Sequence, residues 1–187
     1  MKIYINIFNL FSSLNRKLQL RKRSLKYLLT PNISIDKKVF LGKNIKIEII
    51  GGGKVIIGKN CTIHDFVQIL TYGGEIKIGE NTSINPYTII YGHGNTTIGS
   101  NVMIAAQNVI IPENHQYSDK HELLKMSGTV KKGITIEDNV WIGTGCKILD
   151  GIIIREGSII AAGAVINKST ENYSIWGGIP GKKIKSY

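Results

Sequence analysis

Residues 136–168 read IEDNVWIGTGCKILDGIIIREGSIIAAGAVINK, and isoleucine occupies every sixth position of this stretch. The whole series falls into six groups of three positions: Ile35, Leu41, Ile47, Ile57, Ile63, Ile69, Ile78, Ile84, Ile90, Ile98, Ile104, Ile110, Ile136, Ile142, Ile148, Ile154, Ile160 and Ile166. An amphipathic helix repeats about every 3.6 residues and a half-buried strand about every two, so a period of six fits neither. It is typical of a β-helix built from hexapeptides.

Two further columns of the repeat support this interpretation. The fourth residue after each isoleucine is mostly small or β-branched. The third is mostly Asn or Gly: Asn44, Asn60, Asn81, Asn101, Asn139, Gly145, Gly151, Gly157 and Gly163. We expect each hexapeptide to form one short strand and one corner, with the isoleucine inside a triangular prism and Asn or Gly at positive φ. Three hexapeptides then complete one coil.

Extra residues interrupt the repeat after Ile47, Ile69, Ile90 and Ile110, each the third member of its group. All four insertions are therefore expected at the same corner of the prism. The last insertion is the longest and occupies residues 111–133. A long loop on a regular solenoid is usually functional or disordered, so we expect this one to carry the functional site.

Length and composition suit one domain with terminal appendages. Of the 187 residues, 42% are hydrophobic, which is ample for a core. We expect a basic helical segment at 1–32, a β-helix domain at 33–168 and a C-terminal tail at 169–187. Cys61 and Cys146 fall in the small-residue column, so we expect both to fill the core. Nothing in their placement indicates a disulfide framework or a zinc site. We therefore expect the protein in a reducing compartment, the cytoplasm.

The formal net charge of +11 is unevenly distributed, since residues 1–28 contain seven Lys or Arg and no acidic residue. Their apolar residues follow one face of an amphipathic helix: Ile3, Ile7, Leu10, Phe11, Leu14 and Leu18. No apolar run approaches the roughly 20 residues of a membrane span. Three interpretations stay open: a cap on the end of the solenoid, peripheral contact with the inner face of an anionic membrane, or capture of an acidic glycan. No motif supports nucleic-acid binding.

Motifs near the long loop make the pattern more specific. The loop contains ENHQY at residues 113–117, the chain re-enters the repeat with DNVWIG at 138–143, and it ends with GGIPGKKIK at 177–185. Over roughly residues 55–185, these motifs and the six-residue period resemble the hexapeptide-repeat acyltransferases. The sugar O-acetyltransferase branch, with galactoside, maltose and polysialic acid O-acetyltransferases, is the most similar. The resemblance implies a left-handed parallel β-helix of about six coils, an exception to the usual right-handed crossover.

The same resemblance implies an acetyl-CoA-dependent O-acetyltransferase that requires no metal. Its expected acceptor is a sugar hydroxyl of a capsule, exopolysaccharide or lipopolysaccharide glycan, or of a precursor of that glycan. Members of this family form homotrimers with each active site between two subunits, and we expect the same here. The loop of one chain would then supply the catalytic residue, and the next chain would supply part of the coenzyme A groove.

Acetyl transfer from a thioester to a hydroxyl requires a base for the hydroxyl proton and donors for the tetrahedral oxyanion. The resemblance assigns the base to His115, because the family places its catalytic histidine in the loop before the DNVWIG-like coil. A neutral imidazole is available at pH 7, and we expect direct transfer without an acyl-enzyme. His121, in the same loop, is the alternative base.

The resemblance also suggests binding residues. Asn85 occupies a position like that of the acceptor-binding asparagine of the galactoside enzymes. Trp141 would project from a flat face and contact the substrate, the pantetheine arm or the neighbouring subunit. A backbone N–H around Gly143 or Ala162 is expected to meet the oxyanion, and small residues such as Ala162 and Gly163 leave room for the arm. With cations for the coenzyme phosphates, the coenzyme-binding set is completed by Gly143, Ala162, Gly163, Lys168, Lys182 and Lys185. Alternatively, the residues on the flat faces and the lysines of the tail are exposed to solvent and bind nothing.

Other functions stay open on the same fold. An N-acetyltransferase of a nucleotide-linked amino sugar differs mainly in its acceptor. A metal-dependent protein similar to the γ-carbonic anhydrases would use three histidines per metal, and His93, His115 and His121 could nominally supply them. A catalytically inactive binding protein is a further alternative. The Trp141 coil and the C-terminal tail favour acetyl-CoA over these last two.

Overall fold

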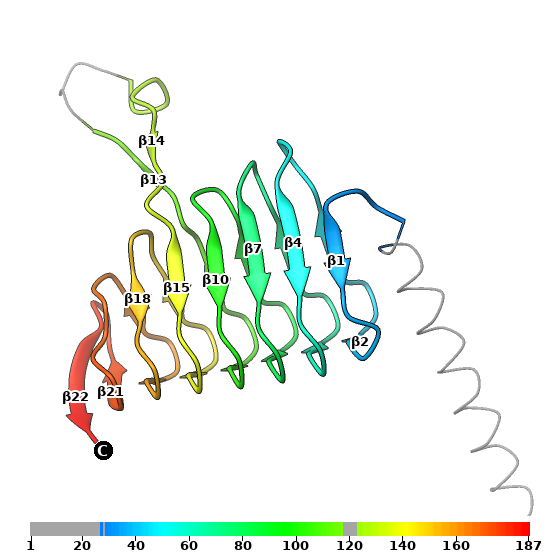
Figure 1. Cartoon of the computed structure of the whole chain (residues 1–187). Helices are drawn as coiled ribbons and strands as arrows, with labels where there is room; N and C mark the ends of the chain where they lie inside the picture. Colours follow the sequence, from blue (N-terminus) through cyan, green and yellow to red (C-terminus); the bar gives the residue numbers. More distant parts are fainter. Residues whose placement is uncertain (1–26, 28, 118–122) are drawn as a thin grey trace, which may run out of the picture.

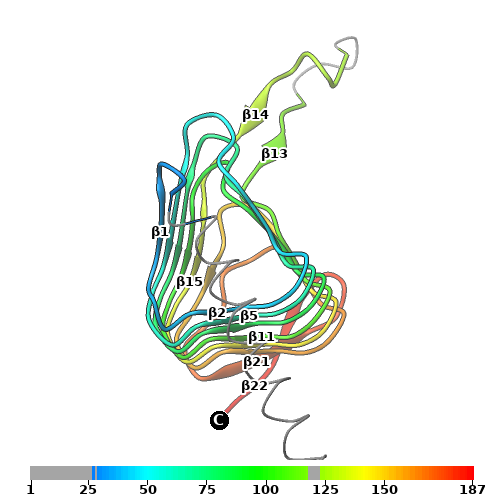
Figure 2. The ribbon, with the colours of Figure 1, turned by 90° about the vertical axis from the view of Figure 1, so that its right-hand side faces the viewer.

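The computed structural model describes residue 27 and residues 29–117 and 123–187 (Figure 1). Within them, the chain winds through six coils that stack into a triangular prism. Viewed from the N-terminal end in Figure 2, it runs down one wall, across the second and up the third while receding, which is a left-handed turn. The predicted all-β, left-handed parallel β-helix is confirmed.

Three parallel sheets form the walls of the prism. Sheet A contains β1 (Ile33–Ile35), β4 (Lys54–Ile57), β7 (Glu75–Ile78), β10 (Thr96–Ile98), β15 (Ile134–Ile136) and β18 (Ile153–Ile154). Sheet B contains β2 (Phe40–Leu41), β5 (Thr62–Ile63), β8 (Ser83–Ile84), β11 (Met103–Ile104), β16 (Trp141–Ile142), β19 (Ile159–Ile160), β21 (Ser174–Gly177) and β22 (Lys182–Ser186), of which β22 alone is antiparallel to its neighbour. Sheet C contains β3 (Lys46–Glu48), β6 (Gln68–Leu70), β9 (Ile89–Tyr91), β12 (Val109–Ile110), β17 (Lys147–Ile148) and β20 (Val165–Ile166).

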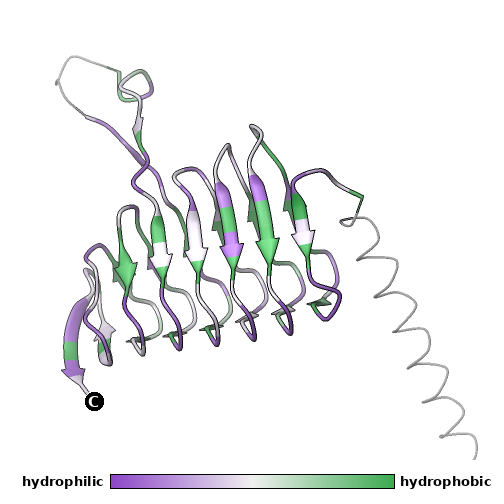
Figure 3. Cartoon of the chain, viewed as in Figure 1, coloured by the Kyte–Doolittle hydropathy of each residue, from purple (hydrophilic) through white to green (hydrophobic). Residues whose placement is uncertain are grey.

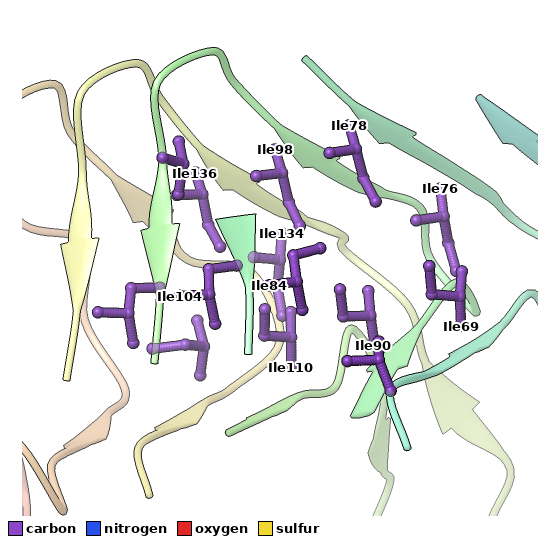
Figure 4. Close-up of a cluster of buried hydrophobic side chains, with 14 of the residues drawn as sticks. Ile69, Ile76, Ile78, Ile84, Ile90, Ile98, Ile104, Ile110, Ile134 and Ile136 are labelled. Atoms are coloured by element: carbon purple, nitrogen blue, oxygen red, sulfur yellow. The ribbon is translucent and has the colours of Figure 1, made fainter. Parts of the chain in front are cut away.

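The isoleucine series fills the inside of the prism, as predicted. Every member from Ile57 to Ile166 is buried, and the parallel register places each one over its equivalent in the next coil. Ile98, for example, pairs with Ile78 on one side and Ile136 on the other, and Figure 4 shows these columns of side chains. Isoleucine suits the position because its χ1 is restricted, and each buried side chain contributes about 1.5–3 kcal/mol.

The corners adopt the predicted left-handed backbone conformation at all nine Asn and Gly positions named from the sequence. The same conformation also occurs at Phe66, Tyr87 and Gln107, each with φ of 62°. These three residues lie between sheets B and C in successive coils. Coil closure imposes positive φ at this corner whatever the residue type, at a cost of about 1–2 kcal/mol for a residue with a Cβ.

The two ends of the solenoid are finished differently. The predicted helical segment at 1–32 lies almost wholly outside the described residues, but Tyr27 is buried and its hydroxyl donates to the Ile45 carbonyl at 3.0 Å. At the other end, the tail forms β21, which extends sheet B, and β22, whose residues are mostly hydrophilic (Figure 3). Within the described residues, no helix is long and apolar enough to cross a membrane.

Candidate active site

The four insertions all lie between sheet C and sheet A, so they share one corner of the prism as predicted. The longest insertion is residues 111–133, and its described residues, 111–117 and 123–133, project from this corner as an arm (Figures 1 and 2). Its base is a short antiparallel hairpin of β13 (Asn114–His115) and β14 (Thr129–Val130). Residues 118–122, including His121, lie outside the described part of the arm. His115 is exposed on β13, so its imidazole is accessible to a ligand.

A group of side chains holds the arm where it leaves the prism. We call it the root cluster, and it comprises Tyr72, Tyr91, His93, Glu113, Thr129 and Lys131. At its centre, Nδ1 of His93 lies 2.6 Å from Oε2 of Glu113. The second carboxylate oxygen of Glu113 lies 3.4 Å from Nζ of Lys131, and the Thr129 side chain also hydrogen-bonds to Glu113.

The environment of His93 favours its neutral form. Its side chain is only 15% exposed and stacks on the ring of Tyr72, with centroids 4.7 Å apart and planes 5° from parallel. Burial lowers the pKa of His93 below its ordinary value, against the opposing effect of Glu113, and Lys131 lowers it further. The neutral ring therefore donates its Nδ1 proton to Glu113 and leaves Nε2 as an acceptor.

Glu113 is ionised in this setting. Its side chain is 18% exposed, and burial alone would raise the pKa of its carboxyl group. The hydrogen bond from Thr129 and the neighbouring His93 and Lys131 outweigh burial, so the pKa of Glu113 is lowered. The root cluster thus contains a carboxylate that interacts with three residues from two segments: His93 in the preceding insertion, and Thr129 and Lys131 on the returning side of the arm.

From the sequence, His93 is only a nominal metal ligand in an insertion-corner loop, and Glu113 is not identified as its partner. The one available signal was positional, since both residues follow the third strand of their coils. Successive coils stack their corners, so equivalent insertions come into contact even though their sequences share no motif.

Most of the predicted coenzyme and acceptor residues lie on another side of the prism. Trp141, on β16 of sheet B, is 48% exposed and is flanked in register by Met103 and Ile159. Asn85 follows β8 of the same sheet, and its Nδ2 donates to the Ile104 carbonyl of the next coil at 2.9 Å.

The small residues predicted to bind the coenzyme differ in their solvent exposure. Ala162 and Gly163 are exposed at the corner between sheets B and C. Gly143, in the preceding coil, is buried, and a Cβ there would lie 2.7 Å from the Ala162 nitrogen. The N–H of Gly143 donates to the Ile160 carbonyl, so this group is not available to an oxyanion. Gly143 therefore allows the two coils to pack closely.

The predicted phosphate-binding lysines do not form one group. Lys182 and Lys185 are exposed on β22, at the end of sheet B. Lys168 follows β20 and precedes Thr170, whose N–H donates to the Ile153 carbonyl of sheet A. Lys168 therefore belongs to the corner between sheets C and A, on the side of the arm.

Within one chain, His115 and Trp141 are on different sides of the prism. The arm leaves from the corner between sheets C and A, which is opposite sheet B (Figure 2). The structure brings Asn85, Trp141, Ala162 and Gly163 to sheet B and its corner with sheet C, and it leaves His115 away from them. A single chain therefore does not assemble all the predicted residues into one site.

Neither the cysteines nor the acidic and imidazole side chains of the described residues form a second reactive site. Cys61 and Cys146 are buried and unpaired, as predicted for core residues, and burial raises the pKa of both thiols. Neither is placed to act as a nucleophile. Among the described residues, no group of three or more His, Cys, Asp or Glu side chains is arranged to hold a metal ion.

Comparisons with known proteins agree with this architecture. Residues 133–168 match the family described as bacterial transferase hexapeptide (six repeats). Among curated protein sequences, none matches the chain significantly.

Solved structures with the same fold include several acyltransferases. The N-acyltransferase AntD from Bacillus cereus, in complex with dTDP and 3-hydroxybutyryl-CoA, superposes with a TM-score of 0.72 at 21% identity, over 88% of this chain and 87% of that chain. The polySia-specific acetyltransferase NeuO gives a TM-score of 0.59 at 23% identity, over 83% and 82%. A hexapeptide-repeat acetyltransferase from Vibrio cholerae O1 biovar eltor, complexed with acetyl coenzyme A, gives 0.58 at 27% identity, over 78% and 69%.

The six-residue period, the confirmed prism, the match at residues 133–168 and these neighbours agree with one another. The chain is a hexapeptide-repeat protein with the left-handed β-helix of the hexapeptide-repeat acyltransferases.

Proposed function

We propose that this protein is an acetyl-CoA-dependent O-acetyltransferase that acetylates a sugar hydroxyl of a capsule, exopolysaccharide or lipopolysaccharide glycan, or of its precursor. The observation that carries the proposal is the placement of His115 on an arm that projects from a hexapeptide-repeat prism. The acetyl-CoA complex of the Vibrio cholerae protein supports the donor, and the polySia specificity of NeuO supports a glycan acceptor.

His115 acts as the general base in this proposal. Its imidazole removes the proton of the acceptor hydroxyl while the oxygen attacks the thioester carbon, and the tetrahedral intermediate then expels the coenzyme A thiolate. The new bond is C–O, the broken bond is C–S, and the proton passes from the imidazolium to the thiolate. A positioned base contributes about 10²–10⁴-fold to such a step. No residue forms a covalent intermediate.

The active site forms between subunits. Since His115 and Trp141 are on different sides of one prism, the arm of one chain meets sheet B of a neighbour. There Trp141, Ala162 and Gly163 contact the pantetheine arm, Asn85 contacts the acceptor, and Lys182 and Lys185 contact phosphates. A homotrimer, as implied by the family resemblance, satisfies this requirement with three equivalent sites.

The N-terminal segment has a role in the same proposal. Residues 1–28 carry seven cationic and no acidic residues, a composition that suits an anionic membrane surface. A cytoplasmic enzyme held at the inner face of the membrane would meet lipid-linked glycan precursors there.

The second candidate function is N-acylation of a nucleotide-linked amino sugar. A specific observation favours it, because AntD covers more of the chain with a higher TM-score than either acetyltransferase, and a variant of that enzyme was captured with dTDP-4-amino-4,6-dideoxyglucose and coenzyme A. The two candidates share the fold and the use of an acyl-coenzyme A donor, and they differ in the acceptor nucleophile.

The test is release of free coenzyme A thiol from acetyl-CoA, with glycan acceptors and amino-sugar nucleotides compared side by side. We expect turnover with a glycan acceptor and a loss of about 100-fold or more in kcat for His115→Ala, with acetyl-CoA binding retained. Gln116→Ala, a truncation of the next exposed residue on the same arm, is the matched control. Undiminished turnover in His115→Ala would exclude this histidine as the base, and turnover with amino-sugar nucleotides alone would favour N-acylation.

A further inference from the structure

We infer that His93 and Glu113 are positioning residues that hold the arm, and thereby His115, in its working orientation. The inference rests on the proposed function for its catalytic consequence, but the holding itself is a property of the fold. Neither residue is assigned to contact a substrate.

Contacts from the two preceding turns support the outgoing side of the arm. Tyr72, in the turn after β6, stacks on His93 in the turn after β9, and His93 hydrogen-bonds to Glu113 in the arm. The backbone adds a parallel link, because the Gly94 N–H donates to the Pro112 carbonyl at 3.1 Å. Three stacked corners thus hold the first residues of the arm.

Glu113 also joins the two strands of the arm immediately beside His115. Thr129, which hydrogen-bonds to Glu113, is the residue paired with His115 across the hairpin. Lys131, one residue beyond the last of β14, approaches the other carboxylate oxygen. The single carboxylate therefore connects the preceding corner, the outgoing strand and the returning strand.

The returning strand is held again from the following coil. The N–H groups of Lys132 and Gly133 each lie 2.9 Å from Oδ1 of Asp150, which occupies the next corner. Glu113 and Asp150 thus hold the arm from its two sides. Of the two contacts, the one at Glu113 is nearer to His115 in the chain.

These contacts matter because an isolated two-stranded hairpin is marginally stable in water. A charge-assisted hydrogen bond between mostly buried groups is stronger than one between exposed neutral groups. Removing Glu113 leaves the Nδ1–H of mostly buried His93 without this acceptor, and removing His93 takes away the contact between Glu113 and the preceding corner. Either loss opposes the native geometry of the arm. A displacement of a catalytic group by about 1 Å can reduce the rate by about 100-fold.

Four variants of the full-length protein test the inference. His93→Leu and Glu113→Ala each remove the contact. His93→Asn keeps an N–H donor near the position of Nδ1 but has nothing at the position of Nε2. Glu80→Ala is the matched control, because it removes a carboxylate that pairs with Lys59 at 3.0 Å at another corner.

Two readouts are measured on every variant. The first is hydrogen exchange at the Gln116 amide, which bonds to the Gly128 carbonyl in the arm and reports on the arm without any catalysis. The second is kcat and KM for acetyl transfer. We expect faster Gln116 exchange and about a 10- to 100-fold lower kcat in His93→Leu and Glu113→Ala, little change in KM for acetyl-CoA, and substantial recovery of both readouts in His93→Asn.

The possible outcomes distinguish the holding of the arm from the proposed acetyltransferase function. Unchanged Gln116 exchange in His93→Leu and Glu113→Ala overturns the inference whatever the activity. Faster exchange with unchanged kcat also overturns it, because catalysis would then not require the arm to be held in this orientation. If His93→Asn keeps slow exchange yet loses kcat as fully as His93→Leu, His93 acts chemically rather than by positioning. Faster exchange in a protein whose wild type transfers no acetyl group supports the holding and rejects the proposed function.

Discussion

Nδ1 of His93 and Oε2 of Glu113 lie 2.6 Å apart, although the two residues belong to consecutive coils of the solenoid. The contact arises because every insertion leaves the prism at the same corner, so residues at equivalent places in successive insertions become neighbours. In a repeat protein of this kind, residues about one coil apart in the sequence become neighbours in space.

Titration of His93 should make the stability of the protein depend on pH. Burial lowers the pKa of His93 below the ordinary value of 6.5, so the neutral form is favoured by folding. The contribution is complete above the unfolded pKa and is lost as the pH falls through the lower folded value. We expect the free energy of unfolding to fall more between about pH 7 and pH 5 in the wild type than in His93→Asn.

Urea denaturation of both proteins at the two pH values measures this difference. Glu113 does not interfere, because its lowered pKa places its titration below its ordinary value of 4.5 and hence below this window. Tyr72, Tyr91 and Lys131, the other ionisable groups around His93, are present in both proteins, so the comparison isolates the histidine. Equal pH dependence in the two proteins would show that folding does not lower the pKa of His93.

Subunit mixing tests whether His115 and Trp141 belong to sites shared between chains. His115→Ala and Trp141→Ala should each be nearly inactive as pure proteins, since each lacks one half of every site. In co-assembled trimers with equal amounts of both chains, one site in about four receives an intact arm from one chain and an intact sheet B from the next. We therefore expect turnover of about one quarter of the wild-type value.

The control for this experiment is each variant taken through the same co-assembly alone. A gel-filtration profile of each sample establishes that the oligomers formed. Mixed oligomers that stay as inactive as the pure variants would indicate that the arm of one chain and sheet B of the next do not complete a site together.

Tryptophan fluorescence should report the binding of acetyl-CoA. The chain has two tryptophans: Trp141 is about half exposed on sheet B, and Trp176 is buried with its Nε1 donating to Ser174 Oγ at 2.9 Å. Burial of the exposed indole against the pantetheine arm should change its emission. We expect the ligand-induced change to persist in Trp176→Phe and to disappear in Trp141→Phe, and the reverse pattern would place the coenzyme elsewhere.

The corner at Asn139 provides a test of the backbone argument. Its φ is 57°, a conformation that an alanine disfavours by about 1–2 kcal/mol and that glycine adopts without penalty. Asn139→Ala should lower the free energy of unfolding by about this amount, whereas Asn139→Gly should remain close to the wild type. Chemical denaturation measures the free energy of unfolding of both variants. An equal decrease in both would show that the asparagine side chain, rather than the backbone conformation, provides the stability.

The period of six, the inward isoleucines, the Asn and Gly corners and the common corner of the insertions could all be predicted from the sequence. Each is a local requirement that every hexapeptide repeats, so the pattern is visible in the chain itself. The positive φ of Phe66 and Tyr87 could not be read in this way, because those residue types disfavour the conformation that coil closure imposes on them.

The candidate site likewise combines features predictable from the sequence with features that only the stacking of the coils creates. The sequence by itself determined the solenoid and placed His115 in a long insertion, because hydrophobic periodicity and chain length are one-dimensional properties. Tertiary structure alone decided that His93 supports Glu113, that Lys168 is separated from Lys182 and Lys185, and that His115 and Trp141 occupy different sides of the prism. These relationships depend on how the coils stack and on which side of the triangle each residue emerges, and neither is encoded by any single repeat.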